Sequence, residues 1–171
     1  MQRSLKPIAI TVVVLVTAVF AYLYINGLQH TPEASPSPSV STQVKPATVS
    51  ELLKLVNEER AKVGVAPLIL DERLNQSAQR KVDDMVKYDY NAHVSPHDGK
   101  HGYEYINDTG IYCKTDSENY SYITSGILDA KSAVYWWMNS KAHHDAMLDP
   151  KYTLTGFGVS DGKAVEHFCE Q

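Results

Sequence analysis

Residues 152–169 read YTLTGFGVSDGKAVEHFC and carry a strong β-hairpin signal. Two runs that favour β structure, 152–159 and 163–169, flank the dipeptide Asp161-Gly162. Asp-Gly between such runs is a strong hairpin signal, because both residues tolerate the positive φ angles of a tight turn. The C-terminal part of the chain therefore predicts two antiparallel strands.

Amphipathic helices are predicted on the N-terminal side of this hairpin. A capping-box pattern opens a helix over 49–63, along which apolar residues recur at helical spacing until Gly64 ends it. Asp71 can cap a second helix that ends near Asp89. Two further helices are predicted over 103–108 and 128–140.

The remaining segments of the domain predict loops and one more strand. Residues 90–102 are rich in His, Pro, Asp and Gly, which is typical of a loop. Residues 111–123 favour β structure except at their polar centre, 114–119. Helices around a few antiparallel strands indicate the α+β class, with a layered architecture.

The N-terminal part of the chain differs in composition from the rest. Residues 7–25 carry no charge and follow Arg3 and Lys6, a pattern typical of an export signal. The length of this run suits a spanning helix better than a cleaved signal. We therefore expect residues 1–28 to form a transmembrane signal anchor with its N-terminus inside. The alternative is a signal peptide that is cleaved, which would release a secreted protein.

Pro, Ser and Thr dominate residues 29–47, which predicts a semi-stiff, extended linker. The folded domain is then expected over 48–171. Residues 47–171 hold 13 of the 16 Lys and Arg residues and 19 of the 20 Asp and Glu residues, a net charge of −6. Such a charge disfavours nucleic acid as a partner and argues against adhesion of the domain itself to anionic lipid.

Cys113 and Cys169 are the two cysteines of the chain. Two thiols of an exported protein usually pair, and this bond would tie the last predicted strand to the middle one. The alternatives are a redox cysteine or a nucleophilic cysteine. A nucleophile needs an activating base, and His167 is the one histidine close in sequence.

Four polar side chains are candidates for chemistry: His93, Glu118, His143 and His144. Imidazole suits zinc, and a carboxylate can complete such a site or act as base to a bound water. The sequence contains no HExxH motif, no glycine-rich phosphate loop and no G-x-S-x-G elbow. Taken singly, each histidine is better explained as a surface or hydrogen-bonded loop residue.

The order of these landmarks resembles the CAP domains (cysteine-rich secretory, antigen 5 and pathogenesis-related proteins) in their bacterial, SCP-type form. LVNEERAKVGVAPL at 55–68 is similar to the family's opening N-x-x-R…G-x-x-P-L, and Glu118-Asn119 matches its E-N. SKAHHDAML at 140–148 is similar to S-P-G-H-R-x-N-I-L. The resemblance extends over residues 49–171.

The resemblance implies a three-layer α-β-α sandwich with a small antiparallel sheet and a cleft of histidines and acids. In some members this cleft holds a divalent metal, often zinc. His93 and His143 carry over as metal ligands, and with Glu118 as catalytic residues of an enzyme. The second acid, in the family's W-x-x-E, is missing, because Asn139 and Ser140 stand at the matching positions.

Further residues are expected to line the cleft: Asn119, Tyr120, Trp137 and His144. Neighbours on a helix lie about 100° apart, so Trp136 and Trp137 cannot both face the core. We assign Trp137 to the cleft.

Three functions stay open on the sequence alone. The first is a binding module at the cell surface for a lipid, a wall glycan or another protein. The second is a hydrolase that depends on a metal or uses Glu118 as base, assisted by His93 or His143. The third is a structural domain with a vestigial cleft. The missing second acid favours the binding module.

Overall fold

The computed structural model describes residues 44–171, which lie in one compact unit of the chain. The predicted signal anchor at 1–28 and most of the predicted linker lie outside the described residues. Within 44–171, none of the helices combines the length and the apolar character that crossing a bilayer requires.

A four-stranded sheet forms the middle layer, in the order β1-β3-β4-β2. Its strands are β1 (Ile69–Leu70), β2 (Thr115–Tyr122), β3 (Leu154–Ser160) and β4 (Lys163–Glu170). The predicted hairpin is confirmed as β3 and β4, which turn at Asp161 and Gly162, both with positive φ.

Two expectations about the sheet are wrong. The sheet is not purely antiparallel, because the short β1 runs parallel to β3. A parallel pair needs a long connection, and more than eighty residues separate these two strands in sequence. In addition, the polar centre 114–119 is largely strand: β2 pairs with β4 throughout its length, and its polar side chains serve the site described below.

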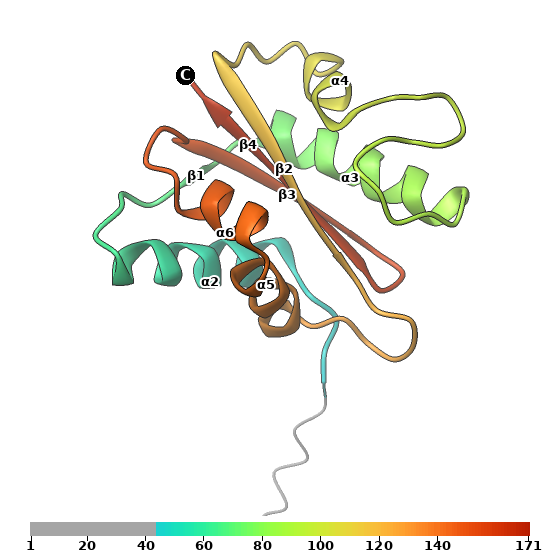
Figure 1. The fold of residues 1–171 in the computed structure, drawn as a ribbon, viewed down its shortest axis with the longest axis horizontal. Helices are drawn as coiled ribbons and strands as arrows, with labels where there is room; N and C mark the ends of the chain where they lie inside the picture. The colour runs from blue at the N-terminus through green and yellow to red at the C-terminus, as the bar shows by residue number, and fades with distance from the viewer. Residues whose placement is uncertain (1–43) are drawn as a thin grey trace, which may run out of the picture. The chain divides into compact units, whose positions relative to one another are not determined.

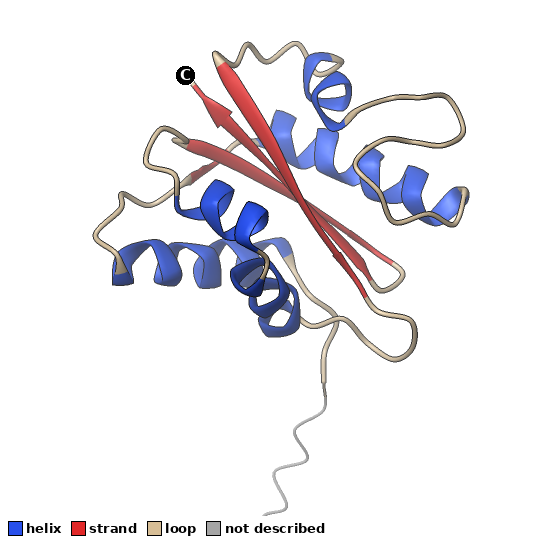
Figure 2. Cartoon of the chain, in the orientation of Figure 1, coloured by secondary structure: helices blue, strands red, loops and turns tan. Residues whose placement is uncertain are grey.

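Helices cover both faces of the sheet, as the resemblance implied (Figure 1, Figure 2). One layer holds α2 (Val49–Lys62), α5 (Ala130–Asn139) and α6 (Lys141–Leu148). The other holds α3 (Glu72–Lys87) and α4 (Gly102–Asn107). Helix α6 was not predicted. Ser140 ends α5 and also begins α6, so two helices follow each other without a separate loop.

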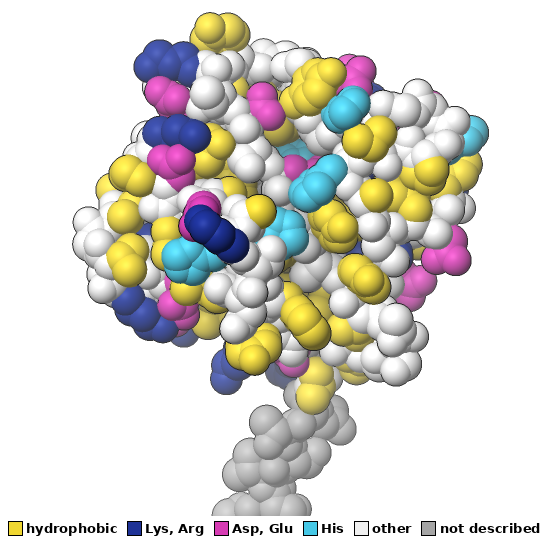
Figure 3. Space-filling view, viewed as in Figure 1, with side chains coloured by type: hydrophobic (Ala, Val, Ile, Leu, Met, Phe, Trp, Pro, Cys, Tyr) yellow, Lys and Arg dark blue, Asp and Glu magenta, His cyan; other side chains and the backbone are white. Residues whose placement is uncertain are grey.

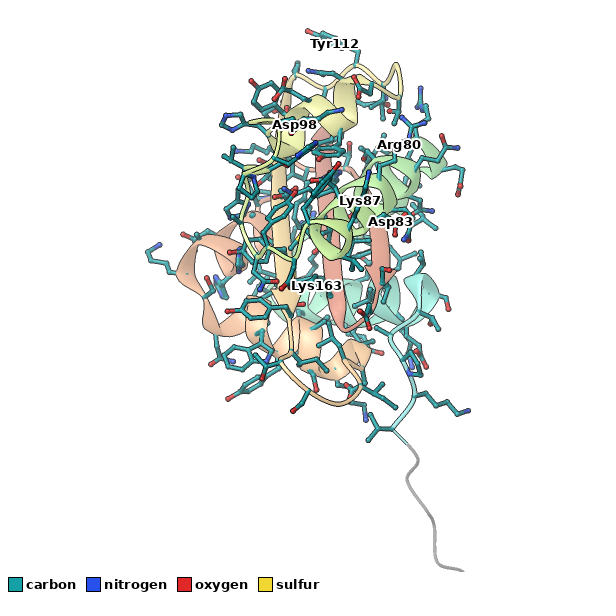
Figure 4. The ribbon with its side chains drawn as sticks, turned by 90° about the vertical axis from the view of Figure 1, so that its right-hand side faces the viewer. Arg80, Asp83, Lys87, Asp98, Tyr112 and Lys163 are labelled. Atoms are coloured by element: carbon teal, nitrogen blue, oxygen red, sulfur yellow. A yellow bond between two sulfur atoms is a disulfide. The ribbon has the colours of Figure 1, made fainter. Side chains whose placement is uncertain are left out.

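Helix α3 lies unusually close to the hairpin. A Cβ atom on Gly156 would lie 2.2 Å from the backbone nitrogen of Asn75, and one on Gly158 would lie 2.4 Å from the backbone carbon of Ala78. Glycine at these two positions of β3 is therefore explained by the close contact between the strand and the helix. The outer face of α3 carries the exposed Arg80, Asp83 and Lys87 (Figure 4).

Side chains of α3 also bind the edge of β3 beyond the short β1. Asn75 Oδ1 accepts a hydrogen bond from the Phe157 amide at 2.9 Å. Gln79 Oε1 accepts one from the Val159 amide at 3.2 Å. These bonds satisfy backbone donors that an open sheet edge would leave unpaired.

The opening N-x-x-R pattern anchors loops rather than forming a site. The buried Arg60 donates hydrogen bonds from its guanidinium to four backbone carbonyls, those of Ala66, Met147, Asp149 and Tyr152, at 2.8–3.1 Å. Asn57 both donates to and accepts from the backbone of Leu68. Arg60 thereby fixes the connection between α6 and β3.

The predicted disulfide is confirmed. Cys113 and Cys169 are bonded; their Cα atoms lie 5.3 Å apart, and the two residues are 56 positions apart in sequence. Both sulfurs are used in this bond, so neither cysteine is a free thiol that could act as a nucleophile. The bond ties the end of β4 to the segment that leads into β2.

Candidate functional site

Glu118 on β2 is the centre of the candidate site. Its Oε1 accepts a hydrogen bond from His93 Nδ1 at 2.8 Å, and its Oε2 accepts one from His167 Nε2 at 2.9 Å. The side chain is 7% exposed. Gly102, at the start of α4, makes room for it, because a Cβ there would lie 2.6 Å from Glu118 Oε2. Both carboxylate oxygens are therefore engaged inside a tight enclosure.

These bonds set the charge of Glu118. Burial alone would raise the pKa of this carboxyl group, but the hydrogen bonds from His167 and His93 outweigh it and lower the pKa to about 2. The charges of His167 and Lys81 act in the same direction. Glu118 is consequently a carboxylate at neutral pH, and its low pKa makes it a poor general base.

His167 on β4 belongs to this site and was missed as a site residue from the sequence. It stands directly opposite Glu118 in the pairing of β2 with β4. Its ring is fully buried, and Nδ1 lies 2.7 Å from Ser77 Oγ on α3. The order Ser77, His167, Glu118, His93 is therefore a continuous hydrogen-bonded chain from the core to the surface.

Lys81 on α3 supports the loop that carries His93. Its fully buried Nζ donates to the backbone carbonyl of His93 at 3.0 Å and to Tyr90 Oη at 3.1 Å. Burial lowers the pKa of Lys81, and the negative charge of Glu118 partly opposes this shift. The hydrogen bond from Lys81 thus holds the backbone of His93 in place, while about half of the His93 side chain is exposed.

Three rings meet above Glu118 and form what we call the ring cluster: His93, Tyr120 and His143. The centroids of His93 and His143 lie 5.9 Å apart, and Tyr120 lies 4.8 Å from His93 and 5.8 Å from His143. Figure 3 shows histidine side chains gathered on this face of the domain. Asn119 Nδ2 donates to the backbone carbonyl of His143 at 3.1 Å and so holds α6 beside β2.

His143 is biased toward its neutral form. Burial lowers its pKa, the nearby His93 lowers it further, and Glu118 acts in the opposite direction. A neutral imidazole offers one donor and one acceptor to a ligand. His144 on the same helix turns away, with its Nδ1 3.3 Å from Asp145 Oδ1. We therefore find no contact of His144 with the ring cluster.

The donor set does not suit a zinc site. Zinc in proteins usually takes three or four His, Cys, Asp or Glu ligands. His93 and His143 lie close together, but Glu118 is already bound through both oxygens. In the part of the chain that the structure describes, no three such side chains converge on one point.

A groove of about 510 Å3 begins at the ring cluster and runs between the end of β2 and the pair α5–α6. We call it the aromatic groove. It is lined by Tyr120, Ser121, Tyr122, Ile123, Thr124, Ser125, Trp136, Ser140 and His143. Tyr120 and His143 belong to both the groove and the ring cluster, so a ligand in the groove would touch the histidine.

The assignment of Trp137 to the cleft is wrong. Trp137 is fully buried and its ring stacks on Phe157 of β3, with the centroids 6.4 Å apart. Trp136 lines the groove instead and is 57% exposed. Trp137 is buried and Trp136 is exposed because Ala133, Val134 and Trp137 lie on the face of α5 that packs into the core.

The family described as the cysteine-rich secretory protein family, CAP, matches residues 53–170. The chain belongs to the CAP family. The uncharacterized protein YkwD of Bacillus subtilis is 33% identical over 144 residues, which is 80% of this chain and 54% of that protein. The uncharacterized membrane protein YlbC of the same organism is 27% identical over 129 residues, 75% of this chain and 36% of that protein.

A solved structure agrees on the fold. An extracellular protein of Bacillus anthracis that contains an SCP domain superposes on 72% of this chain and 40% of its own, with a TM-score of 0.66 and 24% identity. The present chain thus spans about half, or less, of the length of these relatives. At this identity the likeness shows the shared fold alone.

Asn139 and Ser140 stand where other CAP domains carry the second acid. Asn139, one of the two residues at the matching position, lies exposed at the end of α5, and its Nδ2 donates to the carbonyl of Tyr135. Ser140 lines the groove. Neither residue supplies a carboxylate, so the family's second acid position holds no acid in this chain.

Proposed function

We propose that this CAP domain is an exported ligand-binding module whose site is the aromatic groove, with the ring cluster at one end. A lipid, a wall polymer or another surface component would be held there without being cleaved. The protein would act at the outer face of the membrane or, if its signal is removed, as a secreted protein.

The observation that carries the proposal is the state of Glu118. Both oxygens are occupied by histidines, the group is almost fully buried, and its pKa is lowered to about 2. A general base or acid works best with a pKa near the working pH and with access to the substrate. Glu118 meets neither condition, whereas the neighbouring groove is open and large enough for a ligand.

Export is supported by three independent features. Residues 7–25 form an uncharged run after two basic residues. A disulfide persists in oxidising compartments outside the cytosol. One relative is named a membrane protein, and one solved relative is described as extracellular. Together they favour a domain on the outer side of the membrane.

A hydrolase is the second candidate, favoured by the contact between Glu118 and His93. A carboxylate that orients an imidazole is the arrangement that activates a nucleophile in many hydrolases. His93 could then act on a water molecule between itself and His143. Within residues 44–171, however, no Ser, Thr or Cys side chain is hydrogen-bonded to His93.

The test combines binding with turnover. The fragment 44–171, which contains the whole described core, is mixed with purified Gram-positive wall sacculi and, separately, with phosphatidylcholine vesicles. Sedimentation measures binding, and soluble reducing sugar or released fatty acid measures cleavage, with and without zinc. We expect saturable binding to one of the two materials and no cleavage.

Variants separate the two candidates. Trp136→Ala and Tyr122→Ala should weaken binding, because both side chains line the groove. Cleavage by the wild type that disappears in His93→Ala and Glu118→Gln would instead establish the hydrolase. If the fragment bound neither the sacculi nor the vesicles, the proposal would be contradicted.

A further inference from the structure

We propose that the aromatic groove binds a neutral glycan, with a sugar ring stacked on the indole of Trp136. This inference rests on the proposed function and names the class of ligand that the same groove takes.

The lining combines flat rings with hydroxyl groups. Tyr120, Tyr122 and Trp136 supply aromatic faces, and Thr124, Ser125 and Ser140 supply hydroxyl groups, whereas the hydroxyl of Ser121 is buried. A sugar presents an apolar C–H face to a ring and hydroxyl groups at its rim, so it matches both kinds of wall. Ile123 is the one aliphatic side chain among the lining residues.

The exposure of the aromatic residues is not explained by folding. Trp136 is 57% exposed and Tyr122 is 43% exposed, although the buried face of α5 is already complete with Ala133, Val134 and Trp137. Large exposed rings that rim a hollow mark an interaction surface. The groove therefore presents two ring faces to solvent where a ligand can cover them.

Charge separates a neutral glycan from anionic ligands. No Lys, Arg, Asp or Glu side chain lines the groove, and burial lowers the pKa of its single histidine, His143, toward the neutral form. The surrounding domain is acidic overall. Phosphate-bearing polymers and anionic headgroups would meet no cation in the groove and a repulsive field around it.

The shape and the hydroxyl groups separate a glycan from an acyl chain. A long acyl chain is best held by an enclosed aliphatic pocket, whereas this groove is open to solvent and has hydroxyl groups along its wall. An open, ring-lined surface suits a ligand that keeps part of its hydroxyl groups in water.

A second hollow extends the surface for a chain of several sugars. Residues Tyr122–Ser125 line the groove and also a polar hollow of about 480 Å3 on their other side. Asp89, Asn91 and Lys163 contribute polar atoms there, and Lys163 Nζ donates to Asn91 Oδ1 at 2.6 Å. Lys163 is labelled in Figure 4. The hollow offers donors and acceptors to the hydroxyl groups of a neighbouring sugar.

The test is a titration of the fragment 44–171 with the N-acetylglucosamine tetramer and with cellotetraose, followed by amide chemical shifts and calorimetry. We expect saturable binding of at least one tetramer, with shifts concentrated at Tyr122–Ser125 and Trp136. Trp136→Ala should weaken this binding about tenfold or more, as truncation of a central aromatic contact usually does.

Tyr112→Ala is the matched control. Tyr112 is also a large exposed aromatic residue, with 79% of its surface in solvent, and it lies outside the groove. Its replacement should change the affinity less than about twofold, well below the loss expected for a central contact. An equal loss in both variants would overturn the stacking on Trp136.

The result also distinguishes this inference from the proposed function. Binding to sacculi or vesicles that depends on Trp136, with no binding of either tetramer, would overturn the glycan and leave the binding module with a peptide or lipid ligand. If the wild type bound none of these materials, both the glycan inference and the proposed binding function would be overturned. Tetramer binding unaffected by Trp136→Ala would place the glycan elsewhere on the domain and overturn the site.

Discussion

Two buried glutamates stand on neighbouring strands and point to opposite faces of the sheet. Glu118 on β2 lies on the face covered by α3 and α4, and Glu166 on β4 lies on the face covered by α2 and α5. Glu118 accepts hydrogen bonds from two histidines, and its pKa is lowered to about 2. Glu166 accepts one from Thr155, and burial raises its pKa well above the ordinary value.

The difference shows that hydrogen-bond donors and nearby charges, and not the depth of burial alone, decide the pKa of a buried carboxyl group. Glu118 has two imidazole donors at its oxygens and Lys81 nearby. Glu166 has the charge of Arg60 nearby, but Arg60 directs its guanidinium hydrogen bonds to four backbone carbonyls. One face of the sheet therefore holds a carboxyl group whose pKa is lowered at the site, and the other holds a carboxyl group whose pKa is raised inside the core.

The largest effect is expected from Arg60→Ala, which removes the cation on the core face. Four backbone carbonyls lose their donor, two of them in buried hydrogen bonds, and the cost should be about 3–5 kcal/mol in the free energy of unfolding. Arg60→Lys should lose less of the free energy of unfolding than Arg60→Ala, because an ammonium group keeps the charge but cannot reach all four carbonyls. Urea unfolding measures both.

Arg73→Ala is the control for Arg60→Ala, since the exposed Arg73 pairs with Asp71 at the surface and its loss should leave stability nearly unchanged. If Arg60→Ala were as mild as Arg73→Ala, the proposed anchoring role of Arg60 would be wrong.

Acid should weaken the domain through Glu118. A carboxyl group with a lowered pKa stabilises the folded state above its unfolded pKa of 4.5, and this contribution disappears as pH falls toward about 2. The shift corresponds to about 3 kcal/mol. Urea unfolding at pH 5 and at pH 2 should show that Glu118→Gln is the more weakly pH-dependent protein. Equal losses in both proteins would contradict the assigned charge.

Much of the fold could be predicted from the sequence because local signals agree with the tertiary structure. The Asp-Gly hairpin and the capped helices lie where the patterns placed them, and the two cysteines pair. Helix α6 was missed because its residues, KAHHDAML, are mixed in polarity and lack a loop that separates them from α5. Trp137 was misassigned because neighbouring tryptophans differ only in helical phase.

The site could be predicted only in part, because its centre depends on strand register. His93, Glu118 and His143 were candidates by residue type, resemblance to the family assigned them to one cleft, and the structure brings all three together. His167 is 49 residues from Glu118, and it becomes a partner only when the polar residues of β2 are recognised as a strand. The available signal was the alternation of Val165, His167 and Cys169, which puts an imidazole on a buried face where it needs a partner.

Gly102→Ala is expected to have a smaller effect that acts on the same carboxylate. The added Cβ would meet Glu118 Oε2 at 2.6 Å, so the carboxylate must move away from His167. Adjustment around an added methyl group in a tight site costs about 1–3 kcal/mol. The pKa of Glu118 should rise as its hydrogen bonds lengthen, which carboxyl-carbon NMR detects. Gly99→Ala, at a position where a Cβ meets nothing, is the comparison; its own cost comes from positive φ and should leave the pKa of Glu118 unchanged.

The smallest change is expected from Glu166→Gln at pH 4, because the amide replaces a carboxyl group that is already neutral in the folded state and keeps an acceptor for Thr155. Its pH dependence should be opposite in sign to that of Glu118→Gln. A raised pKa means that the wild type loses stability as pH rises above 4.5, where the unfolded chain ionises and the buried group does not. The variant carries no such group, so its free energy of unfolding should increase relative to the wild type between pH 4 and pH 8. A variant that instead falls behind the wild type as pH rises would show that Glu166 is ionised and paired with Arg60, and the contrast between the two faces would then be lost.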